Sequence, residues 1–240
     1  MRLPPRSHVR SAATVVFPCP KSLDTAMPLR LTSRDSEILD HLSMSVRLFS
    51  LDQIARAWWG DSEDPRKLAD ERILRLARAG WVERYSVLAR PIPEITAPVV
   101  CWRTGQSPAD FGKVAWQVQS RWKKGPRKCL VVVASDRTTK SRLGKSARGI
   151  RQYFQLTHDL GVAETFLRFR ETRPEEATLW RGEGMIASLR RQRKVPDAII
   201  SGDAIWPPKL IVEFAGDYAR NRIEVFHWFC EKERLAYELW

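Results

Sequence analysis

Apolar residues recur at helical spacing in two segments near the start of the chain. The first follows the capping residues Thr32 and Ser33, with an apolar stripe formed by Ile38, Leu39 and Leu42. The second covers residues 51–59, is preceded by the capping residue Ser50 and is followed by a glycine. This pattern predicts two short helices joined by a tight connection.

A third helical segment begins at Asp64-Pro65 and stops at Gly80. Proline suits the first position of a helix, because that position needs no backbone donor. The apolar side chains of the segment are spaced i, i+4, i+7 and are Ala69, Ile73 and Leu76. We expect this face to pack against the first two helices.

The pattern changes to strand-like alternation over residues 81–87. A proline-rich stretch follows, and residues 99–102 have the composition of a returning strand. Three helices followed by a two-stranded ribbon is the order of a winged helix-turn-helix. We therefore predict a winged helix-turn-helix over residues 28–105.

The remainder is predicted to hold a basic connecting segment, residues 106–148, and an α/β domain, residues 149–240. The expected elements are a strand at 130–134, a helix at 149–170 bent or broken at Gly161, strands at 198–200 and 210–212, and a last helix at 220–239. The predicted fold class is α/β in the α+β sense: an N-terminal winged helix-turn-helix followed by a small α/β domain.

Charge favours a polyanionic partner. The chain has 41 Lys and Arg against 28 Asp and Glu, a net charge of +13, and double-stranded DNA is the first candidate, ahead of an anionic membrane surface. The stretch from residue 121 to 151 contains eleven basic residues and one acid. It could follow a phosphate backbone or form a solvated linker.

The third helix is the expected DNA-reading element, because the second helix of a helix-turn-helix pair enters the major groove. Its outer surface and the ribbon after it supply the candidate DNA-binding residues Lys67, Arg72, Arg75, Arg78 and Arg84. The alternative is a winged helix that docks another protein subunit.

The compartment expected from the sequence is the cytoplasm. The sequence contains no apolar run of about 18 residues, so we expect no membrane-spanning helix. The four cysteines are far apart, a spacing that does not indicate a dense disulfide framework. Residues 1–27 are basic and rich in Ser, Thr and Pro. We interpret them as a disordered basic arm or as the result of a start codon placed too early, with Met27 as the alternative start.

Acidic residues near two predicted strands suggest a metal-dependent nuclease site. Asp197 precedes one strand, Glu213 ends the next, and Glu164 lies on the preceding helix. Nucleases use such carboxylates to bind Mg²⁺, usually with a lysine that orients the attacking water. Position 215, two residues after Glu213, holds alanine, which argues against catalysis. His158, on the same helix as Glu164, is interpreted as a core or capping residue.

Four short motifs resemble the replication-relaxation family of plasmid and mobile-element proteins. They are LARAGWV at 76–82, HDLGVAE at 158–164, VPDA at 195–198 and VEF at 212–214. The resemblance implies a second half similar to the PD-(D/E)xK nuclease fold, with Glu164, Asp197 and Glu213 as a vestigial acidic set. It also implies a role in replication, DNA relaxation or mobilisation, beside a relaxase or replication protein.

Two other functions remain open from the sequence. A Mg²⁺-dependent endonuclease guided by the winged helix would use Asp197 and Glu213 as metal ligands. A winged-helix interaction subunit would use the same first half to bind protein. The preferred hypothesis is a DNA-binding protein that needs no cofactor and has an inactive nuclease-like domain.

Overall fold

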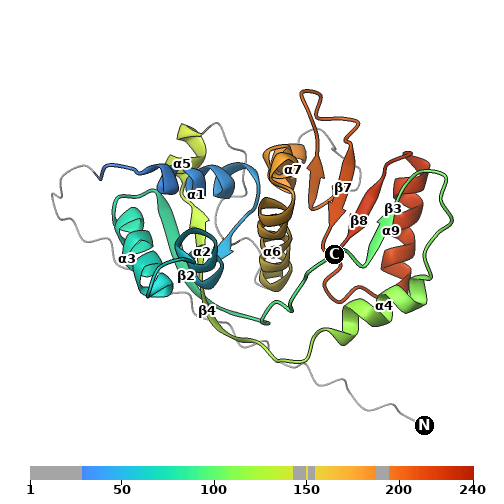
Figure 1. Cartoon of the computed structure of the whole chain (residues 1–240), viewed down its shortest axis with the longest axis horizontal. Coiled ribbons are helices and arrows are strands. Elements are labelled where there is room, and N and C mark those ends of the chain that lie inside the picture. Colours follow the sequence, from blue (N-terminus) through green and yellow to red (C-terminus); the bar gives the residue numbers. More distant parts are fainter. Residues whose placement is uncertain (1–28, 143–149, 151–154, 188–194) are drawn as a thin grey trace, which may run out of the picture.

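The strands of the protein form two sheets that lie on opposite sides of helix α6 (Leu156–Thr172) (Figure 1). The computed structural model describes residues 29–142, 150, 155–187 and 195–240. The expected basic arm, residues 1–27, lies outside the described residues. So do residues 149 and 151–154 of the helix predicted to begin at residue 149. The mixed helices and sheets confirm an α+β fold.

Local capping signals set the first three helices, α1 (Ser33–Met44), α2 (Leu51–Trp59) and α3 (Pro65–Arg78). Thr32 and Ser50 each form a capping box, and the Asp64 side chain accepts a hydrogen bond from the Lys67 backbone N–H. The inner face of α3 is fully buried, at Ala69, Ile73 and Leu76. These helices and the packing face of the third are therefore confirmed.

The first sheet is antiparallel and has the strand order β1 (Phe49–Ser50), β4 (Arg127–Ala134), β2 (Val82–Ala89). The prediction that residues 99–102 pair with β2 is wrong, because β4 takes that position. All eight residues of β2 find a partner in β4, from Val82 opposite Ala134 to Ala89 opposite Arg127. The segment between β2 and residues 99–102 contains prolines, which lack the backbone N–H that a strand pair needs. The chain therefore leaves the sheet after β2 and does not turn back to form a hairpin.

The segment between β2 and β4 crosses to the second half of the molecule. It contains β3 (Val100–Trp102), which pairs with the last strand of the chain, and α4 (Phe111–Ser120). The second sheet has the order β3-β8-β7-β6-β5, with β5 (Trp180–Gly182), β6 (Ala198–Ile200), β7 (Leu210–Glu213) and β8 (Tyr237–Leu239). Three short helices complete the described elements: α5 (Asp136–Ser141), α7 (Pro174–Thr178) and α8 (Glu183–Ile186).

Strands β7 and β8 are parallel and are connected through α9 (Arg220–Lys232). The prediction of a last helix reaching residue 239 is correct for α9 and wrong beyond it. Arg234 has a φ of 56°, a left-handed conformation that does not continue a helix. The chain then enters the sheet as β8, between β3 and β7.

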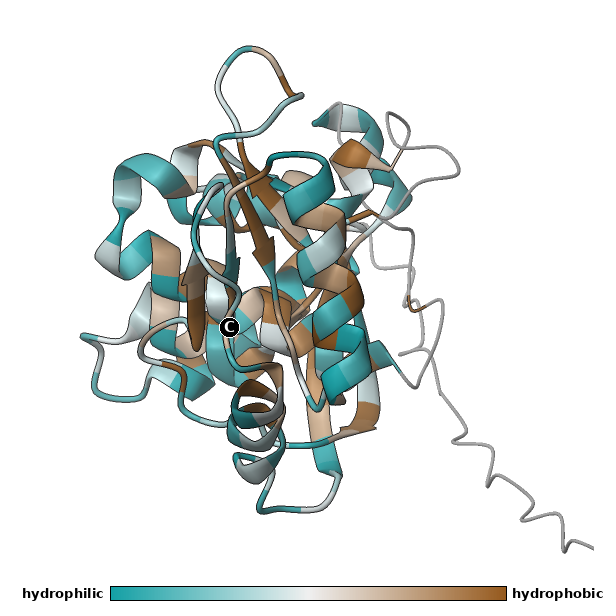
Figure 2. Cartoon of the chain, turned by 90° about the vertical axis from the view of Figure 1, so that its right-hand side faces the viewer, coloured by the Kyte–Doolittle hydropathy of each residue, from teal (hydrophilic) through white to brown (hydrophobic). Residues whose placement is uncertain are grey.

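Helices cover both faces of the second sheet, and alternating strand residues contact them. Ala198, Ile200 and Val212 face the core shared with α6, whereas Ile199 and Ile211 face α4 and α9. Figure 2 shows the strands in the brown of hydrophobic residues behind helices of mixed polarity. A sheet buried on both faces explains why these strands appear in the sequence as continuous apolar runs.

Helix α6 is continuous through Gly161, so the predicted break at this residue is wrong. A Cβ atom built on Gly161 would lie 2.0 Å from Cε1 of Phe214. Phe214 is itself buried, at 1% exposure. The glycine therefore allows the helix to approach the second sheet closely, which is a packing role and not a break.

One hydrophobic core joins the two halves. The same cluster contains Leu39 of α1, Ile73 of α3, Phe166 of α6 and Val212 of β7. The other face of the first sheet packs against Leu156 and Leu160 of α6. The two units expected from the sequence thus pack as one body, in which α6 is the shared element.

Candidate functional site

The hairpin of β6 and β7 brings Asp197 and Glu213 together, as predicted. The backbone N–H of Asp197 donates to Oε2 of Glu213 at 3.4 Å, and the Phe214 N–H donates to Oδ2 of Asp197 at 2.8 Å. Glu213 is 3% exposed. Asp197 directly precedes β6 and Glu213 ends β7, so the two carboxylates are neighbours in the hairpin.

His158 of α6 forms an ion pair with Asp197, with 2.9 Å between Nε2 and Oδ1. Burial alone would lower the pKa of His158. The charges of Asp197, Glu213 and Asp159 and the hydrogen bond to Asp197 outweigh that effect and raise the pKa to about 9. His158 is therefore protonated at neutral pH and neutralises part of the acidic cluster, a role beyond the expected core or capping one.

Glu213 has a separate set of partners. The Tyr218 hydroxyl donates to Oε1 of Glu213 at 3.0 Å, and Nη2 of Arg222 donates to the same hydroxyl at 2.9 Å. The Arg222 guanidinium lies over the Tyr218 ring, 3.7 Å from its centre. Burial and the neighbouring carboxylates raise the pKa of Tyr218, so the hydroxyl keeps its proton and remains a donor.

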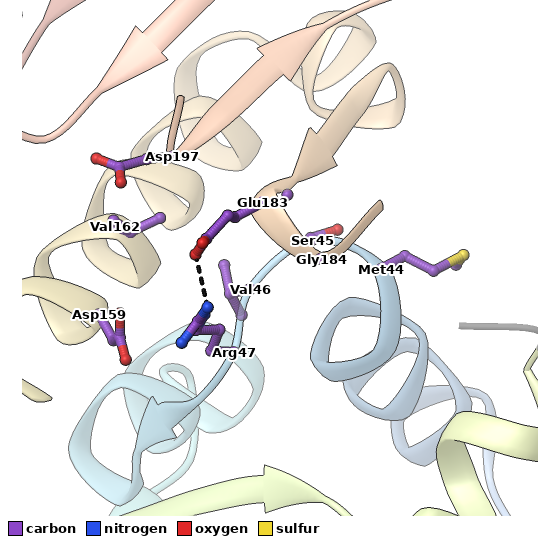
Figure 3. Close-up of a pocket in the computed structure, with 10 residues that line it drawn as sticks. Met44, Ser45, Val46, Arg47, Asp159, Val162, Glu183, Gly184 and Asp197 are labelled. Atoms are coloured by element: carbon purple, nitrogen blue, oxygen red, sulfur yellow. Dashed lines mark ion pairs between the residues drawn. The ribbon is translucent and has the colours of Figure 1, made fainter. Parts of the chain in front are cut away.

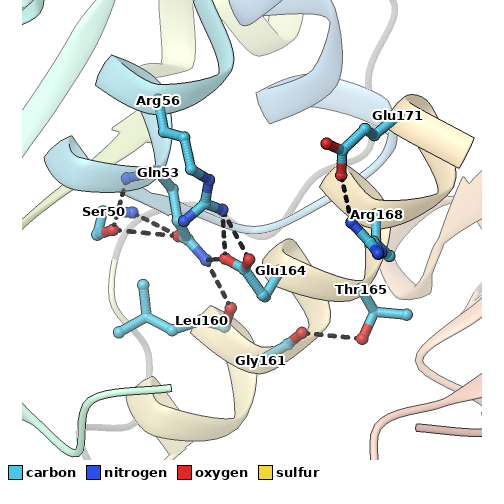
Figure 4. A network of polar contacts seen from close by, with 9 residues as sticks. All are labelled: Ser50, Gln53, Arg56, Leu160, Gly161, Glu164, Thr165, Arg168 and Glu171. Carbon is cyan, nitrogen blue, oxygen red and sulfur yellow. Dashed lines mark hydrogen bonds and ion pairs between the residues drawn. The ribbon is translucent and has the colours of Figure 1, made fainter. Parts of the chain in front are cut away.

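Glu164 does not join this cluster, and its assignment to the acidic set is wrong. It points toward α2, where Arg56 donates to both of its oxygens at 2.6 and 2.8 Å and Gln53 donates at 3.0 Å (Figure 4). Gln53 also donates to the carbonyl of Leu160. Glu164 therefore fastens the first half of the protein to α6.

Two acids that the sequence analysis missed lie beside Asp197. Asp159 of α6 and Glu183 of α8 line a cavity of about 20 Å³ together with Asp197 and Arg47, enough space for one water molecule. Arg47 reaches in from the first half and pairs with Glu183 at 2.8 Å (Figure 3). Burial raises the pKa of Asp159 to about 6, against the opposing effects of Arg47 and His158.

The carboxylates of Asp197 and Glu213 are held by protein donors and are not arranged around a metal position. Both oxygens of Asp197 and both of Glu213 already accept hydrogen bonds from protein groups. Across the described ranges, no group of three or more His, Cys, Asp and Glu residues has an arrangement that could hold a metal ion. Ala215, where the lysine would stand, is fully buried.

The outward surface of α3 carries three of the five predicted DNA-binding residues. Lys67, Arg75 and Arg78 are exposed. Arg75 is 3.6 Å from Glu71, and both side chains are about half exposed or more, so this pair contributes little to stability. Helix α3 lies at the end of the molecule remote from α9 (Figure 1), which leaves this surface accessible.

The other two predicted residues are engaged within the protein. Arg72 donates to Asp35 and to the carbonyl of Arg30, and Asp35 is fully buried. Burial alone would raise the pKa of Asp35, but hydrogen bonds from Arg72 and Thr32 outweigh it and lower the pKa. Arg84 pairs with Asp70 of α3 and is 13% exposed. Both arginines hold α3 in place.

A second basic surface lies where the chain returns to the first sheet. Its exposed members, at the start of β4 and just before it, are Lys123, Lys124, Arg127 and Lys128. Arg127 and Lys128 belong to the antiparallel ribbon of β2 and β4, and all four residues lie in the basic stretch that could follow a phosphate backbone.

Comparisons with protein-family models, curated proteins and solved structures found no match to this chain. Among the helices that the structure describes, none is long and apolar enough to cross a membrane.

Proposed function

We propose that the protein binds double-stranded DNA through the outward surface of α3, with the basic start of β4 contacting the phosphate backbone. The observation that carries this proposal is the division of α3 into two faces: its apolar side is fully buried, and its other side exposes Lys67, Arg75 and Arg78. Arginine forms bidentate contacts with guanine edges and with phosphates. Three helices braced by an antiparallel ribbon support a winged helix-turn-helix as the binding unit.

Reversing two charges on α3 tests the proposal. We expect Arg75→Glu with Arg78→Glu to weaken binding to a duplex at least about tenfold, because two phosphate contacts become repulsive. The slope of log affinity against log salt concentration should fall by about 2 in magnitude. Fluorescence anisotropy with a labelled duplex over a salt series measures both quantities.

The matched control is Lys113→Glu with Lys209→Glu, which changes the net charge equally on exposed positions of α4 and of the edge of β7. This variant should bind DNA nearly as the wild type does. If the α3 variant binds no more weakly than the control variant, α3 is not the DNA-reading element, and docking of a protein subunit becomes the better interpretation.

The carboxylate cluster supports a structural role for the nuclease-like half. Asp197 is neutralised by His158, Glu213 is bound by Tyr218, and no lysine occupies position 215. The helix, three antiparallel strands and parallel fourth strand around these acids are compatible with a PD-(D/E)xK-like unit. The proposed function is therefore DNA binding without hydrolysis, and it requires no cofactor.

Incubation with supercoiled plasmid tests this part of the proposal. We expect the wild-type protein to leave the plasmid supercoiled in the presence of Mg²⁺ or Mn²⁺, as seen on an agarose gel. A divalent-dependent nick that disappears in Asp197→Ala would instead establish the endonuclease hypothesis. DNA binding by that variant, measured at a temperature where circular dichroism shows it folded, should be unchanged in either case.

The resemblance to replication-relaxation proteins suggests the process in which the DNA-binding protein acts. We propose that the protein belongs to a plasmid or mobile element and acts there in replication, DNA relaxation or mobilisation, beside a relaxase or replication protein. The motifs near Trp81, Asp197 and Glu213 support this extension.

A further inference from the structure

The end of the molecule opposite α3 exposes large apolar side chains on two neighbouring helices. Trp116 of α4 is 70% exposed, and Val225 and Trp228 of α9 are 64% and 50% exposed. Helices α4 and α9 pack against each other on the outer face of the second sheet (Figures 1 and 2). Exposed apolar clusters of this kind mark interaction surfaces.

The exposed residues of α9 form one straight stripe. Asn221, Val225, Trp228 and Lys232 follow the spacing i, i+4, i+7, i+11. The opposite face of the helix, including Ile223, Phe226 and Cys230, is buried against the sheet. Tryptophan at the centre of such a stripe is a frequent anchor of protein interfaces.

The charges beside the stripe are self-complementary. Arg220, Glu224 and Glu231 lie on one flank of α9, since they are spaced i, i+4, i+11. Arg220 lies 3.6 Å from Glu224 on its own helix but is 68% exposed, so it can also reach a second copy, and Glu231 is exposed. Arg220 and Glu231 stand at opposite ends of the helix. The point halfway between Arg220 and Glu231 and the point halfway between Val225 and Trp228 are about 1.5 Å apart along the helix axis. One two-fold axis can therefore relate both pairs.

We propose that the protein forms a symmetric dimer in which two α9 helices pack antiparallel. A two-fold axis at the middle of α9 places Val225 of each copy against Trp228 of the other. The same axis places each Arg220 opposite the partner copy's Glu231, so that one kind of contact occurs twice. This inference does not depend on DNA binding.

Removal of the apolar anchor is the first test. Sedimentation velocity of the full chain over a concentration series should show a wild-type dimer. Trp228→Ser should raise the dimer dissociation constant at least about tenfold. Leu88→Ser is the matched control, because Leu88 is 54% exposed on β2, far from α9, and it should leave the dimer unchanged.

Charge exchange tests the antiparallel geometry. Arg220→Glu and Glu231→Arg should each weaken self-association, since each places like charges opposite one another twice. An equimolar mixture of these two variants should dimerise nearly as the wild type does, because both contacts in the mixed dimer are then between opposite charges.

Each other outcome overturns the proposal. A wild type that sediments as a monomer up to its solubility limit excludes the dimer. A dimer that Trp228→Ser leaves intact uses another surface. A mixture that associates no better than the separate variants excludes the antiparallel arrangement.

Discussion

Gly161→Ala should destabilise the protein by roughly 2–4 kcal/mol, although alanine is the better helix former. The new methyl group would lie 2.0–2.4 Å from three carbon atoms of the Phe214 ring. This ring is 1% exposed and cannot turn into solvent, so α6 and β7 must move apart. Thermal unfolding followed by circular dichroism should show a melting temperature lower by about 5–15 °C.

Gly112→Ala is the control for this substitution. Gly112 also lies in a helix, α4, but its added methyl group would meet only the Asp110 side chain, at 3.3 Å. The gain in helix propensity and the crowding of this capping carboxylate oppose each other, so stability should change by no more than about 1 kcal/mol. Equal melting temperatures for Gly161→Ala and the wild type would contradict the packing role of this glycine.

Asp197→Ala should also be strongly destabilising, by roughly 2–4 kcal/mol at neutral pH. The substitution removes the partner of a protonated His158 and the acceptor of the Phe214 N–H at the same time. Chemical denaturation measures the loss. Asp203→Ala, at an exposed position of the turn between β6 and β7, should change stability little.

The pH dependence identifies the ion pair as the cause. The pKa of His158 is raised from 6.5 to about 9 in the folded protein. The pair therefore contributes fully below about pH 6.5, and its contribution is lost as the pH rises through 9. The stability difference between wild type and Asp197→Asn, which keeps the side-chain shape, should shrink over this range. A difference that is constant from pH 6.5 to 9.5 would contradict this assignment.

Helix bounds could be predicted closely where the signals are local. Ser50, Gly60 and Asp64-Pro65 mark the ends of α2 and the start of α3 through contacts within one turn. Asp197 and Glu213 could be paired because a hairpin connects them. These features depend on residues close in sequence, and a single chain reveals them directly.

Strand partners and helix faces required the tertiary structure. The pairing of β2 with β4 joins segments separated by residues 90–126, and the nearer strand β3 was the local alternative. Asp159 and Glu164 are five residues apart, about 140° around α6, so only one of them can face the second sheet. Asp159 lies at helical spacing i, i+3, i+7 with the apolar residues Val162 and Phe166. This spacing was the signal in the sequence that Asp159, and not Glu164, shares the face toward the second sheet.

The ion pairs of α3 and α6 also explain why charged residues were misassigned. Arg72 and Glu164 are charged residues on helices, and Arg84 is one on a strand, as is usual for solvent-exposed surfaces. Each instead pairs with a residue on a different element. A basic or acidic residue near a predicted site is therefore weak evidence for ligand contact until its neighbours are known.

The crossing of the chain between β2 and β4 determines how the protein can be divided. A fragment that ends near residue 105 keeps β2 but loses β4, and leaves an unpaired strand edge that invites aggregation. A fragment that begins there loses β3 from the opposite sheet. Neither cut leaves both sheets complete, so point substitutions in the intact chain are more informative than truncation.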